Sequence, residues 1–413
     1  MKSPTLLVTT AAAFAMWTLP PPTAAQSPYP PPAPANCRTT GTFAAWLQAF
    51  RTEALAAGIS RVTVASALDG MTMDPGVISR DRKQGFFAQS FLAFSDKLIS
   101  QGRIQNGLAR LRQHRDLFAE VERKYGVPGP VITAFWALES DYGSFIGKLP
   151  VLRALATLAY DCRRPDMFRA ELLDALRIID RGDLTPEEMI GSWAGELGQT
   201  QFLPSHYLKH AVDFDGDGKR NLIASIPDVI ASSANFIVHL GWKRGQPWLE
   251  EVRVPSELPW DQADLAVQHP RAKWAAWGVV GRDEKALPQD TVPASLVLPM
   301  GRHGPAFLAY ENFQVYLKWN QSLNYCLTAA YLANRLAGAP SMNRGSREIP
   351  ELSMEQVKTL QRLLARSGYD VGEPDGKIGA ATRAAVKAAQ MKLGLPADSY
   401  PTSELIERLH ALR

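Results

Sequence analysis

The sequence predicts a mainly α-helical protein that contains a small strand-containing insertion and ends in a separate helical unit. Three observations predict this class. Apolar residues recur at three- and four-residue spacing over much of residues 40–241. Between about 249 and 318, runs of β-prone residues are broken by Pro and Gly. A polar linker at 341–350, SMNRGSREIP, then separates residues 351–413, which have an apolar stripe of their own.

The composition is that of an ordinary globular protein. The 413 residues are 46% hydrophobic and 21% charged, which is enough for two or three domains with a sizeable core. The formal net charge of +4 is too small to indicate nucleic-acid binding. We therefore expect no nucleic-acid partner.

The N-terminus predicts export. Lys2 precedes a short apolar run, LLVTTAAAFAMW, and then PPTAAQ, a pattern that predicts a cleavable signal peptide over residues 1–25. The run is too short to span a bilayer comfortably and no second long run follows, so we expect a periplasmic chain without a transmembrane segment. The Pro-rich residues 26–39 are predicted to form a tether.

Three cysteines allow one disulfide and leave one thiol over. Cys326 lies in an apolar helical stretch, where a buried free thiol is expected. Cys37 and Cys162 both lie in turn-like, polar surroundings, and export permits them to pair. The prediction is a Cys37–Cys162 disulfide.

The main domain, placed at 40–340, is predicted to be helical on both sides of the insertion. Its first part shows helical spacing at Phe43, Trp46, Phe50, Ile104, Leu108 and Leu111. The sequence TPEE at 185–188 is a capping box that predicts a helix start, and 191–204 is expected to be an exposed loop. Helices are predicted again at 226–241 and at 321–337, where the domain closes.

The stretch Gly129–Gly147, GPVITAFWALESDYGSFIG, is the strongest candidate for chemistry. Pro130 suits the first helical position and Gly143 suits the stop. The residues between them leave almost no polar face, which predicts a buried helix, and Glu139 is its first ionisable residue. Burial and the negative helix end both favour the protonated acid that general-acid catalysis requires. The alternative is a Glu that turns to solvent where the helix ends.

No second acid is placed by the sequence to share the chemistry of Glu139. Ordinary glycosidases use two carboxylates that flank the scissile bond. Asp141 is two residues away and points to another face of the helix. Glu196 and Asp161 are expected to be solvated or structural residues.

Several ordered motifs resemble one family. Glu139-Ser140 followed by Tyr142-Gly143 resembles the "ES…G" signature of the lysozyme-like superfamily. The segments GSWAGELGQTQFLPSHY and AVDFDGDGKRNL are similar to lytic murein transglycosylases of the B type, and the likeness extends over about 40–338. The resemblance implies a lysozyme-like catalytic domain and a monomer that binds peptidoglycan glycan strands.

The resemblance also implies a reaction that needs a single carboxyl group. Glu139 would protonate the β-1,4 glycosidic oxygen between N-acetylmuramic acid and N-acetylglucosamine. As a carboxylate it would then take the proton of the sugar's C6 hydroxyl, which closes a 1,6-anhydro ring without water.

Five further residues match family positions around the substrate. Ser192 matches a serine that contacts Glu139 or the sugar, and Gln201 matches a glutamine that holds an N-acetyl group. Asn320 and Tyr325 match a polar pair near the acid. Trp319 stands where the pattern has Tyr, so it offers a stacking face but lacks the phenolic hydrogen bond. Alternatively, Ser192 caps a turn, Gln201 bonds loop backbone, and Tyr325 belongs to the core.

An Asp- and Gly-rich segment at 213–219, DFDGDGK, resembles the opening of an EF-hand calcium loop. Asp213, Asp215 and Asp217 occupy positions 1, 3 and 5 and a Gly occupies position 6, an arrangement suited to a hard cation. Lys219 at position 7 can contribute its backbone carbonyl. The prediction is a structural Ca²⁺ site, and the alternative is a metal-free surface turn.

The usual Glu at position 12 of such a loop is replaced by Ala224. In the resembled family the last ligand comes from a slightly later Asp, and Asp228 is the candidate. It falls one residue beyond the expected position.

The C-terminal unit, residues 351–413, resembles the small three-helix peptidoglycan-binding domain of cell-wall enzymes. The likeness rests on DGKIG at 375–379 and on Thr382 three residues later. The alternative is a helical module that binds another protein.

Two other functions remain possible for the whole chain at this point. One is a hydrolytic muramidase on the same fold. The other is a non-enzymatic wall-binding protein with a calcium-stabilised scaffold.

Overall fold

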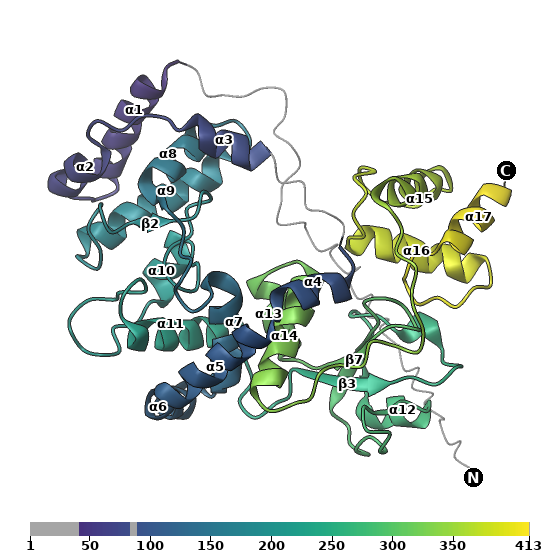
Figure 1. Cartoon of the computed structure of the whole chain (residues 1–413). Coiled ribbons are helices and arrows are strands. Elements are labelled where there is room, and N and C mark those ends of the chain that lie inside the picture. Colours follow the sequence, from purple (N-terminus) through teal and green to yellow (C-terminus); the bar gives the residue numbers. More distant parts are fainter. Residues whose placement is uncertain (1–40, 83–88, 413) are drawn as a thin grey trace, which may run out of the picture. The chain divides into compact units, whose positions relative to one another are not determined.

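Helices dominate residues 41–82 and 89–412, which are the residues that the computed structural model describes (Figure 1). They confirm the predicted mainly α-helical class with a small sheet. The predicted signal peptide 1–25, the tether 26–39 and Cys37 lie outside the described residues, so the Cys37–Cys162 disulfide stays a prediction. None of the described helices is both long and apolar enough to cross a membrane.

The first part of the chain folds into short helices, in agreement with the predicted helical pattern. These helices are α1 (Phe43–Ala56), α2 (Arg61–Leu68), α3 (Pro75–Arg82), α4 (Phe91–Leu98), α5 (Gln101–Gln113) and α6 (Arg115–Tyr125). Four of them begin at a Thr or Ser whose hydroxyl accepts a hydrogen bond from a backbone N–H three residues later. Each cap satisfies a donor that the first helical turn leaves free.

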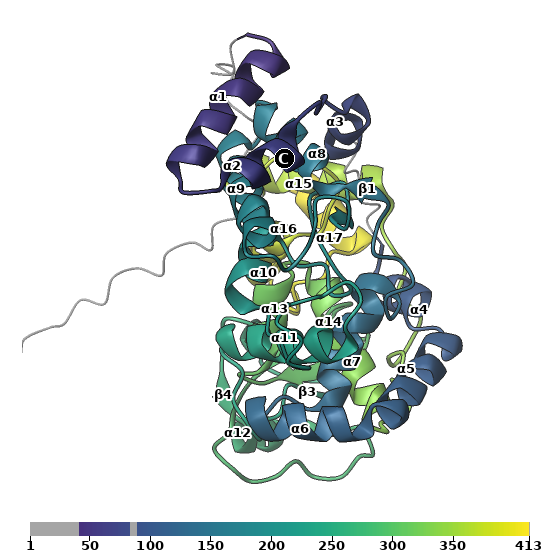
Figure 2. The same ribbon diagram turned by 90° about the vertical axis from the view of Figure 1, so that its left-hand side faces the viewer.

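The second group of helices surrounds α7 (Gly129–Ser140). Its members are α8 (Val151–Tyr160), α9 (Pro165–Asp180), α10 (Pro204–His210), α11 (Ile226–His239), α13 (Phe313–Trp319) and α14 (Leu323–Leu336). The α7 helix packs against α5, α6, α11 and α14, and it lies beside α14 in both views (Figures 1 and 2). Helices from both ends of the main domain therefore cover the predicted buried helix. The free thiol of Cys326, on α14, is buried as expected.

The capping box at 185–188 closes a turn but starts no helix, so that prediction was wrong. The Thr185 backbone N–H donates to the Glu188 carboxylate at 2.8 Å, and the Glu188 N–H donates to Thr185 Oγ1 at 3.4 Å. The chain then enters β2 (Ile190–Gly191), which pairs antiparallel with β1 (Leu149–Pro150). Strand pairing directly after the box leaves no room for a second helical turn.

A five-stranded antiparallel sheet forms the insertion predicted near 249–318. Its strands are β3 (Leu249–Arg253), β4 (His269–Pro270), β5 (Val280–Gly281), β6 (Pro293–Val297) and β7 (Ala306–Ala309), in the order β4-β6-β7-β3-β5. The short helices η1 (Trp260–Gln262) and α12 (Arg271–Ala276) belong to the same module. Trp274, Leu296 and Leu308 are fully buried in a core separate from that of the helical domain.

The C-terminal unit consists of α15 (Met354–Arg366), α16 (Ala380–Lys392) and α17 (Ser403–Ala411), around its own apolar core. Buried Gln361 ties its turn together: its amide accepts from the Gly376 N–H at 2.8 Å and donates to Thr382 Oγ1 at 3.2 Å. Thr382 in turn donates to the Lys377 carbonyl. The DGKIG motif thus forms the turn between α15 and α16.

Residues 341–350, predicted as a linker, are bonded to the rest of the chain through residues 343–346. The Asn343 N–H donates to Glu251 Oε1 at 2.6 Å, and the Ser346 N–H donates to the His303 carbonyl at 2.8 Å. Arg344 forms a two-point ion pair with Asp96, with distances of 3.0 and 2.8 Å. The segment lacks helix and strand, but its backbone is attached at several points.

Candidate active site

The end of α7 brings Glu139 to the edge of the helical core. Apolar side chains from Val131 to Ala137 are fully buried, as the sequence pattern predicted. The helix ends at Ser140 because Asp141 and Tyr142 adopt left-handed backbone conformations, with φ of 49° and 61°. It therefore stops three residues before the predicted Gly143. Glu139 sits in the last turn and is half-buried.

Two hydrogen-bond donors from distant parts of the chain meet on one oxygen of Glu139. Trp319 Nε1, at the end of α13, donates to Glu139 Oε1 at 2.9 Å. The Tyr325 hydroxyl, in the first turn of α14, donates to the same oxygen. The structure therefore gives Trp319 a hydrogen bond to the acid, a role that the sequence analysis had reserved for a phenol at this position. One face of its indole stacks on Phe135, with ring centroids 4.2 Å apart.

Burial raises the pKa of Glu139 to about 7, although the hydrogen bonds from Tyr325 and Trp319 lower it and the nearby charge of Glu196 raises it further. Burial penalises the charged form, whereas each donor stabilises that form. The pKa is raised overall because the effect of burial is larger than that of the two donors. A carboxyl group that is half protonated near neutral pH can both deliver and accept a proton there.

The segment 191–202 is packed against the end of α7, which corrects the predicted exposed loop. Leu197 and Thr200 are almost fully buried. The Ser140 hydroxyl donates to the Gln199 carbonyl, and a Cβ placed on Gly147 would lie 1.9 Å from the Gly191 carbonyl oxygen. The loop and the turn after α7 approach so closely that only glycine fits at Gly147.

Ser192 directs its hydroxyl to Glu196 rather than to Glu139. Its Oγ donates to Glu196 Oε2 at 2.9 Å and accepts from the backbone N–H groups of Ala194 and Glu196 at 3.1 and 3.2 Å. The hydroxyl thus closes a tight turn, which is the alternative that the sequence left open for Ser192. Glu196 is half-buried and bonded to Ser192, so of its two expected roles, solvated or structural, the structure supports the structural one.

Gln201 and Asn320 both bond backbone groups next to the site. Gln201 has φ of 50°, and its amide nitrogen donates to the carbonyls of Gly198 at 2.9 Å and Ile146 at 3.2 Å. Asn320 Oδ1 accepts from the Ser322 N–H at 2.9 Å, just before α14 begins. These contacts fix the two segments that flank Glu139.

Sequence reasoning missed Gln199, which joins the loop to α7. Its Oε1 accepts from Trp136 Nε1 at 2.8 Å, and its Nε2 donates to the Ile223 carbonyl at 2.8 Å. Through its one acceptor and one donor, the Gln199 side chain therefore bridges α7 and the segment that follows the Asp-rich loop at 213–219. The available signal was its place between Glu196 and Gln201 in GELGQTQ, where polar amides cluster without an apolar periodicity.

The acidic loop brings the three predicted carboxylates together. One oxygen from each of Asp213, Asp215 and Asp217 lies within 4.8 Å of the others. Asp228 is fully buried, and its two oxygens accept the N–H groups of Phe214 and Asn221, each at 2.7 Å. Asp228 therefore fastens both ends of the loop. Lys219 donates its backbone N–H to Asp217 Oδ1 at 2.8 Å.

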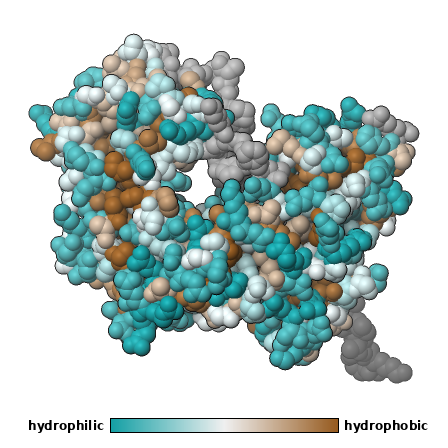
Figure 3. Space-filling view, viewed as in Figure 1, coloured by the Kyte–Doolittle hydropathy of each residue, from teal (hydrophilic) through white to brown (hydrophobic). Residues whose placement is uncertain are grey.

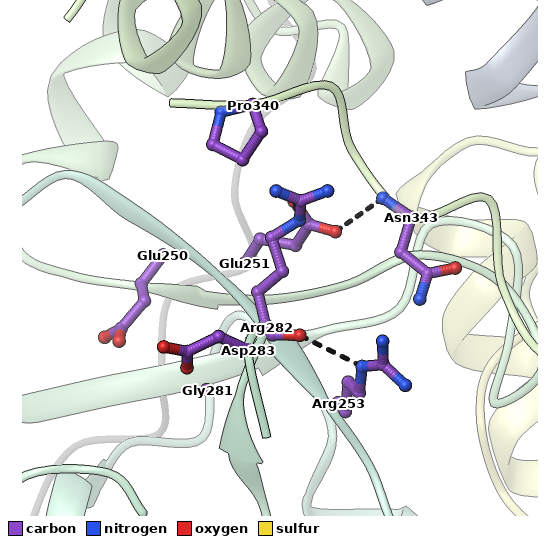
Figure 4. Close-up of a pocket in the computed structure, with 8 residues that line it drawn as sticks. All are labelled: Glu250, Glu251, Arg253, Gly281, Arg282, Asp283, Pro340 and Asn343. Atoms are coloured by element: carbon purple, nitrogen blue, oxygen red, sulfur yellow. Dashed lines mark hydrogen bonds and ion pairs between the residues drawn. The ribbon is translucent and has the colours of Figure 1, made fainter. Parts of the chain in front are cut away.

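A separate polar pocket lies between the sheet and the segment that starts at Pro340 (Figure 4). Its volume is about 590 Å³, and its charged side chains are paired within the chain. Arg282 Nε lies 3.1 Å from Glu251 Oε2, and Arg253 pairs with Glu284 at 2.7 Å. No predicted site residue lines it, so we assign this pocket no part in the chemistry.

A half-buried acid with a pKa near neutrality, held by two donors, is suited to general acid and base catalysis. The family model described as transglycosylase SLT domain matches residues 42–334, and the chain belongs to this family. The model of a peptidoglycan-binding domain matches residues 353–409. The protein is a peptidoglycan lytic transglycosylase.

Known relatives agree with this assignment. A crystal structure of SltB3 from Pseudomonas aeruginosa in complex with NAG-anhNAM-pentapeptide is 43% identical, with a TM-score of 0.84, and covers 90% of this chain and 100% of that one. The membrane-bound lytic murein transglycosylase B of Escherichia coli is 29% identical over 249 residues, 60% of this chain and 68% of the relative. The Escherichia coli lytic transglycosylase Slt35 in complex with calcium is 28% identical, with a TM-score of 0.60, and covers 70% of this chain and 92% of that one.

Proposed function

We propose that the enzyme cleaves the β-1,4 bond between N-acetylmuramic acid and N-acetylglucosamine without water and leaves 1,6-anhydromuramyl ends. The observation that carries the proposal is the single acid Glu139, which accepts hydrogen bonds from Trp319 and Tyr325 and has a raised pKa. The complex of the relative SltB3 with NAG-anhNAM-pentapeptide supports the choice of product.

Glu139 would act twice in one turnover. As the protonated acid, it gives its proton to the glycosidic oxygen while the bond from that oxygen to C1 of the muramyl sugar breaks. The resulting carboxylate takes the proton of the C6 hydroxyl, whose oxygen bonds to C1. Glu139 is therefore protonated again at the end of the turnover, and no water is consumed. A pKa close to neutrality suits both steps.

The neighbours of Glu139 divide into two proposed roles. Trp319 and Tyr325 stabilise the carboxylate that forms after the first proton transfer, because both donate to it. Gln201 and Asn320 are proposed to bind the sugar, with Gln201 Oε1 as an acceptor for an N-acetyl N–H, and their bonds to the chain hold both side chains in fixed positions. The Ser192 hydroxyl is fully used by Glu196 and two backbone N–H groups, so the proposed part of Ser192 in the substrate site is to hold the turn at 192–196 in place.

The acidic loop is proposed to bind a structural Ca²⁺. Asp213, Asp215 and Asp217 supply hard carboxylate oxygens within 4.8 Å of one another, and their like charges favour a bound cation. Lys219 would contribute its carbonyl, whereas Asp228 supports the loop through its backbone bonds and is a weaker candidate ligand. The calcium complex of Slt35 supports the choice of ion.

We propose that the reaction takes place at the cell wall. We infer that residues 351–413 bind peptidoglycan glycan strands, that residues 1–25 direct export to the periplasm, and that Cys37 pairs with Cys162 there. The mature chain is proposed to act as a monomer.

Substitution of the acid tests the assignment of Glu139. Glu139→Gln keeps the shape of the side chain and its acceptor for Trp319 but cannot donate and accept the catalytic proton. We expect the release of soluble fragments from purified murein to fall at least about 100-fold, with an unchanged melting profile. Activity within a few-fold of the parent would contradict the role of Glu139.

A further inference from the structure

A buried glutamine, Gln199, holds the last turn of α7 at two points that flank Glu139. Its side-chain Oε1 accepts from Trp136 Nε1 at 2.8 Å, and its backbone carbonyl accepts from the Ser140 hydroxyl at 2.5 Å. Trp136 and Ser140 are four residues apart, so they lie on one face of the helix, and Glu139 comes between them in the sequence. The turn that carries the acid is thus attached at both ends to one residue.

The partners of the Gln199 amide fix its orientation. The indole N–H of Trp136 can only donate, so it requires the Oε1 end of the amide. The Ile223 carbonyl can only accept, so it requires the Nε2 end, which donates to it at 2.8 Å. The Gln199 backbone N–H donates to the Leu222 carbonyl, also at 2.8 Å. Because Gln199 is only 7% exposed, water competes little for these hydrogen bonds.

The segment on the other side of Gln199 is itself firmly held. The Asn221 N–H donates to the fully buried carboxylate of Asp228 at 2.7 Å. A Cβ placed on Gly198 would lie 2.6 Å from the Leu222 carbonyl oxygen, so the two backbones are in direct contact there. Gln199 therefore connects the last turn of α7 to a segment that is fixed by buried polar bonds and by close backbone packing.

The position of this turn matters because the donors to Glu139 come from other helices. Trp319 Nε1, on α13, donates to Glu139 Oε1 at 2.9 Å, and the Tyr325 hydroxyl, on α14, donates to the same oxygen. Hydrogen bonds weaken steeply when their distance and angle depart from the preferred geometry. A small displacement of the last turn of α7 would therefore weaken both bonds at once.

We propose that Gln199 is a positioning residue for the catalytic acid. It fixes the last turn of α7 so that the Glu139 carboxyl group meets its two donors and the glycosidic oxygen in a single position. It acts through Trp136 and Ser140 and is not itself in contact with the substrate. The proposal deepens the proposed function and rests on Glu139 as the acid.

The kinetic test removes the amide and keeps the length of the side chain. Gln199→Met can neither accept from Trp136 nor donate to Ile223. We expect kcat for the digestion of soluble murein strands to fall about tenfold or more, since small misplacements of a catalytic group are costly. KM should stay within about twofold, because the sugar-binding side chains are unchanged. The assay is run well below the melting temperature of the variant.

The spectroscopic test follows the Trp319 indole N–H, which reports the position of Glu139 without turnover. The full chain is labelled with ¹⁵N, and the signal is assigned by its loss in Trp319→Phe. We expect this signal to move in Gln199→Met, because the bond from Trp319 to Glu139 Oε1 changes, although the substituted side chain bonds Trp136 instead. A folded Gln199→Met chain with the parent's Trp319 signal and kcat would overturn the proposal.

Asn334→Leu is the matched control for a loss of stability alone. The Asn334 amide also donates to the backbone carbonyl of a distant segment, that of Leu249, at 3.0 Å. This variant should melt lower than the parent but keep the Trp319 signal and kcat. If it changed both as Gln199→Met does, general loss of stability would explain the effect and the proposal would fall.

Ser140→Ala keeps the proposal testable if Gln199→Met does not fold. It removes the bond from the Ser140 hydroxyl to the Gln199 carbonyl, and it should also move the Trp319 signal. A signal that stays in place would overturn the proposal. Hydrated product ends, or an active Glu139→Gln chain, would refute the proposed function, whereas the Trp319 signal would still show whether Gln199 fixes the position of Glu139.

Discussion

At the scale of single residues, the site depends on how Trp319 and Tyr325 share one oxygen of Glu139. Both donate to Oε1, and both therefore stabilise the charged form against the cost of burial. Trp319 is fixed for this task because its ring stacks on Phe135 with a centroid distance of 4.2 Å. The indole N–H is thus aimed by packing within the core.

Trp319→Phe should move the pH dependence upward. The variant keeps an aromatic ring against Phe135 but loses the N–H that lowers the pKa of Glu139. The acid then stays protonated to higher pH. We expect the basic limb of the pH profile of murein digestion to move to higher pH by roughly half to one pH unit. A limb that stays in place or moves to lower pH would show that the indole N–H does not stabilise the carboxylate.

The sequence was enough to predict that Glu139 lies at the end of a buried helix, and the family resemblance implied that Trp319 and Tyr325 lie near it, but neither predicted that both donate to the same carboxylate oxygen. The apolar run before Glu139 indicates a buried helix by itself. Trp319 and Tyr325 are 180 and 186 positions away from it, and the pattern does not say which side of the ring faces the acid. Glu196 looked like a loop residue because the compact packing of 191–202 depends on glycines and backbone bonds, which leave no apolar periodicity.

At the scale of elements, the turn after α7 and the loop 191–202 form one unit. Gly147 has φ of 100° and faces the Gly191 carbonyl at a distance that excludes any side chain. This close approach holds the segment that carries Ser192 and Glu196.

Gly147→Ala should therefore destabilise the protein more than an ordinary glycine substitution. The added Cβ would lie 1.9 Å from backbone oxygen, so one segment must move. We expect a loss of about 2–4 kcal/mol in the free energy of unfolding, measured by chemical denaturation. Gly182→Ala is the matched control, since its φ of 84° is also left-handed but its Cβ would meet open space. It should cost only about 1 kcal/mol. Equal losses in the two variants would mean that the contact at Gly191 is not rigid.

The second prediction at this scale concerns the stability of the acidic loop, residues 213–219. If a cation binds the folded loop and not the unfolded chain, its removal lowers stability by mass action, about 2.7 kcal/mol for a site held at 100 times its Kd. Excess chelator should lower the melting temperature by several degrees, and added Ca²⁺ should restore it. The double variant Asp215→Asn, Asp217→Asn should melt lower and no longer respond to chelator. An equal melting temperature of the parent with and without chelator would remove the calcium site.

Element-level prediction succeeded where side chains pack with a clear period and failed where local signals compete. Helices α7, α11 and α14 were predicted near their observed positions. The capping box at 185–188 has the expected bonds, but pairing of Ile190 and Gly191 with β1 takes over directly after it. Strand pairing with residues some forty positions away is invisible in a local pattern.

At the scale of the whole molecule, the C-terminal unit is in contact with the strand module. Arg383 on α16 donates to the carbonyls of Leu298 at 2.8 Å and Pro299 at 3.3 Å, and Lys387 pairs with Asp264 at 2.9 Å. Composition indicated a linker at 341–350 but could not show that its backbone groups bond to the rest of the chain. On the face shown in Figure 3, hydrophilic residues predominate and apolar residues lie in separate patches.

The central claim concerns the reaction, and the mass of the product tests it most directly. Purified murein is digested with the full chain, and the muramyl ends are analysed by mass spectrometry, with Glu139→Gln as the inactive control. The account predicts 1,6-anhydromuramyl ends, lighter by one water than the reducing ends that hydrolysis leaves. Digestion that yields only the heavier, hydrated ends would contradict it and identify the enzyme as a hydrolytic muramidase.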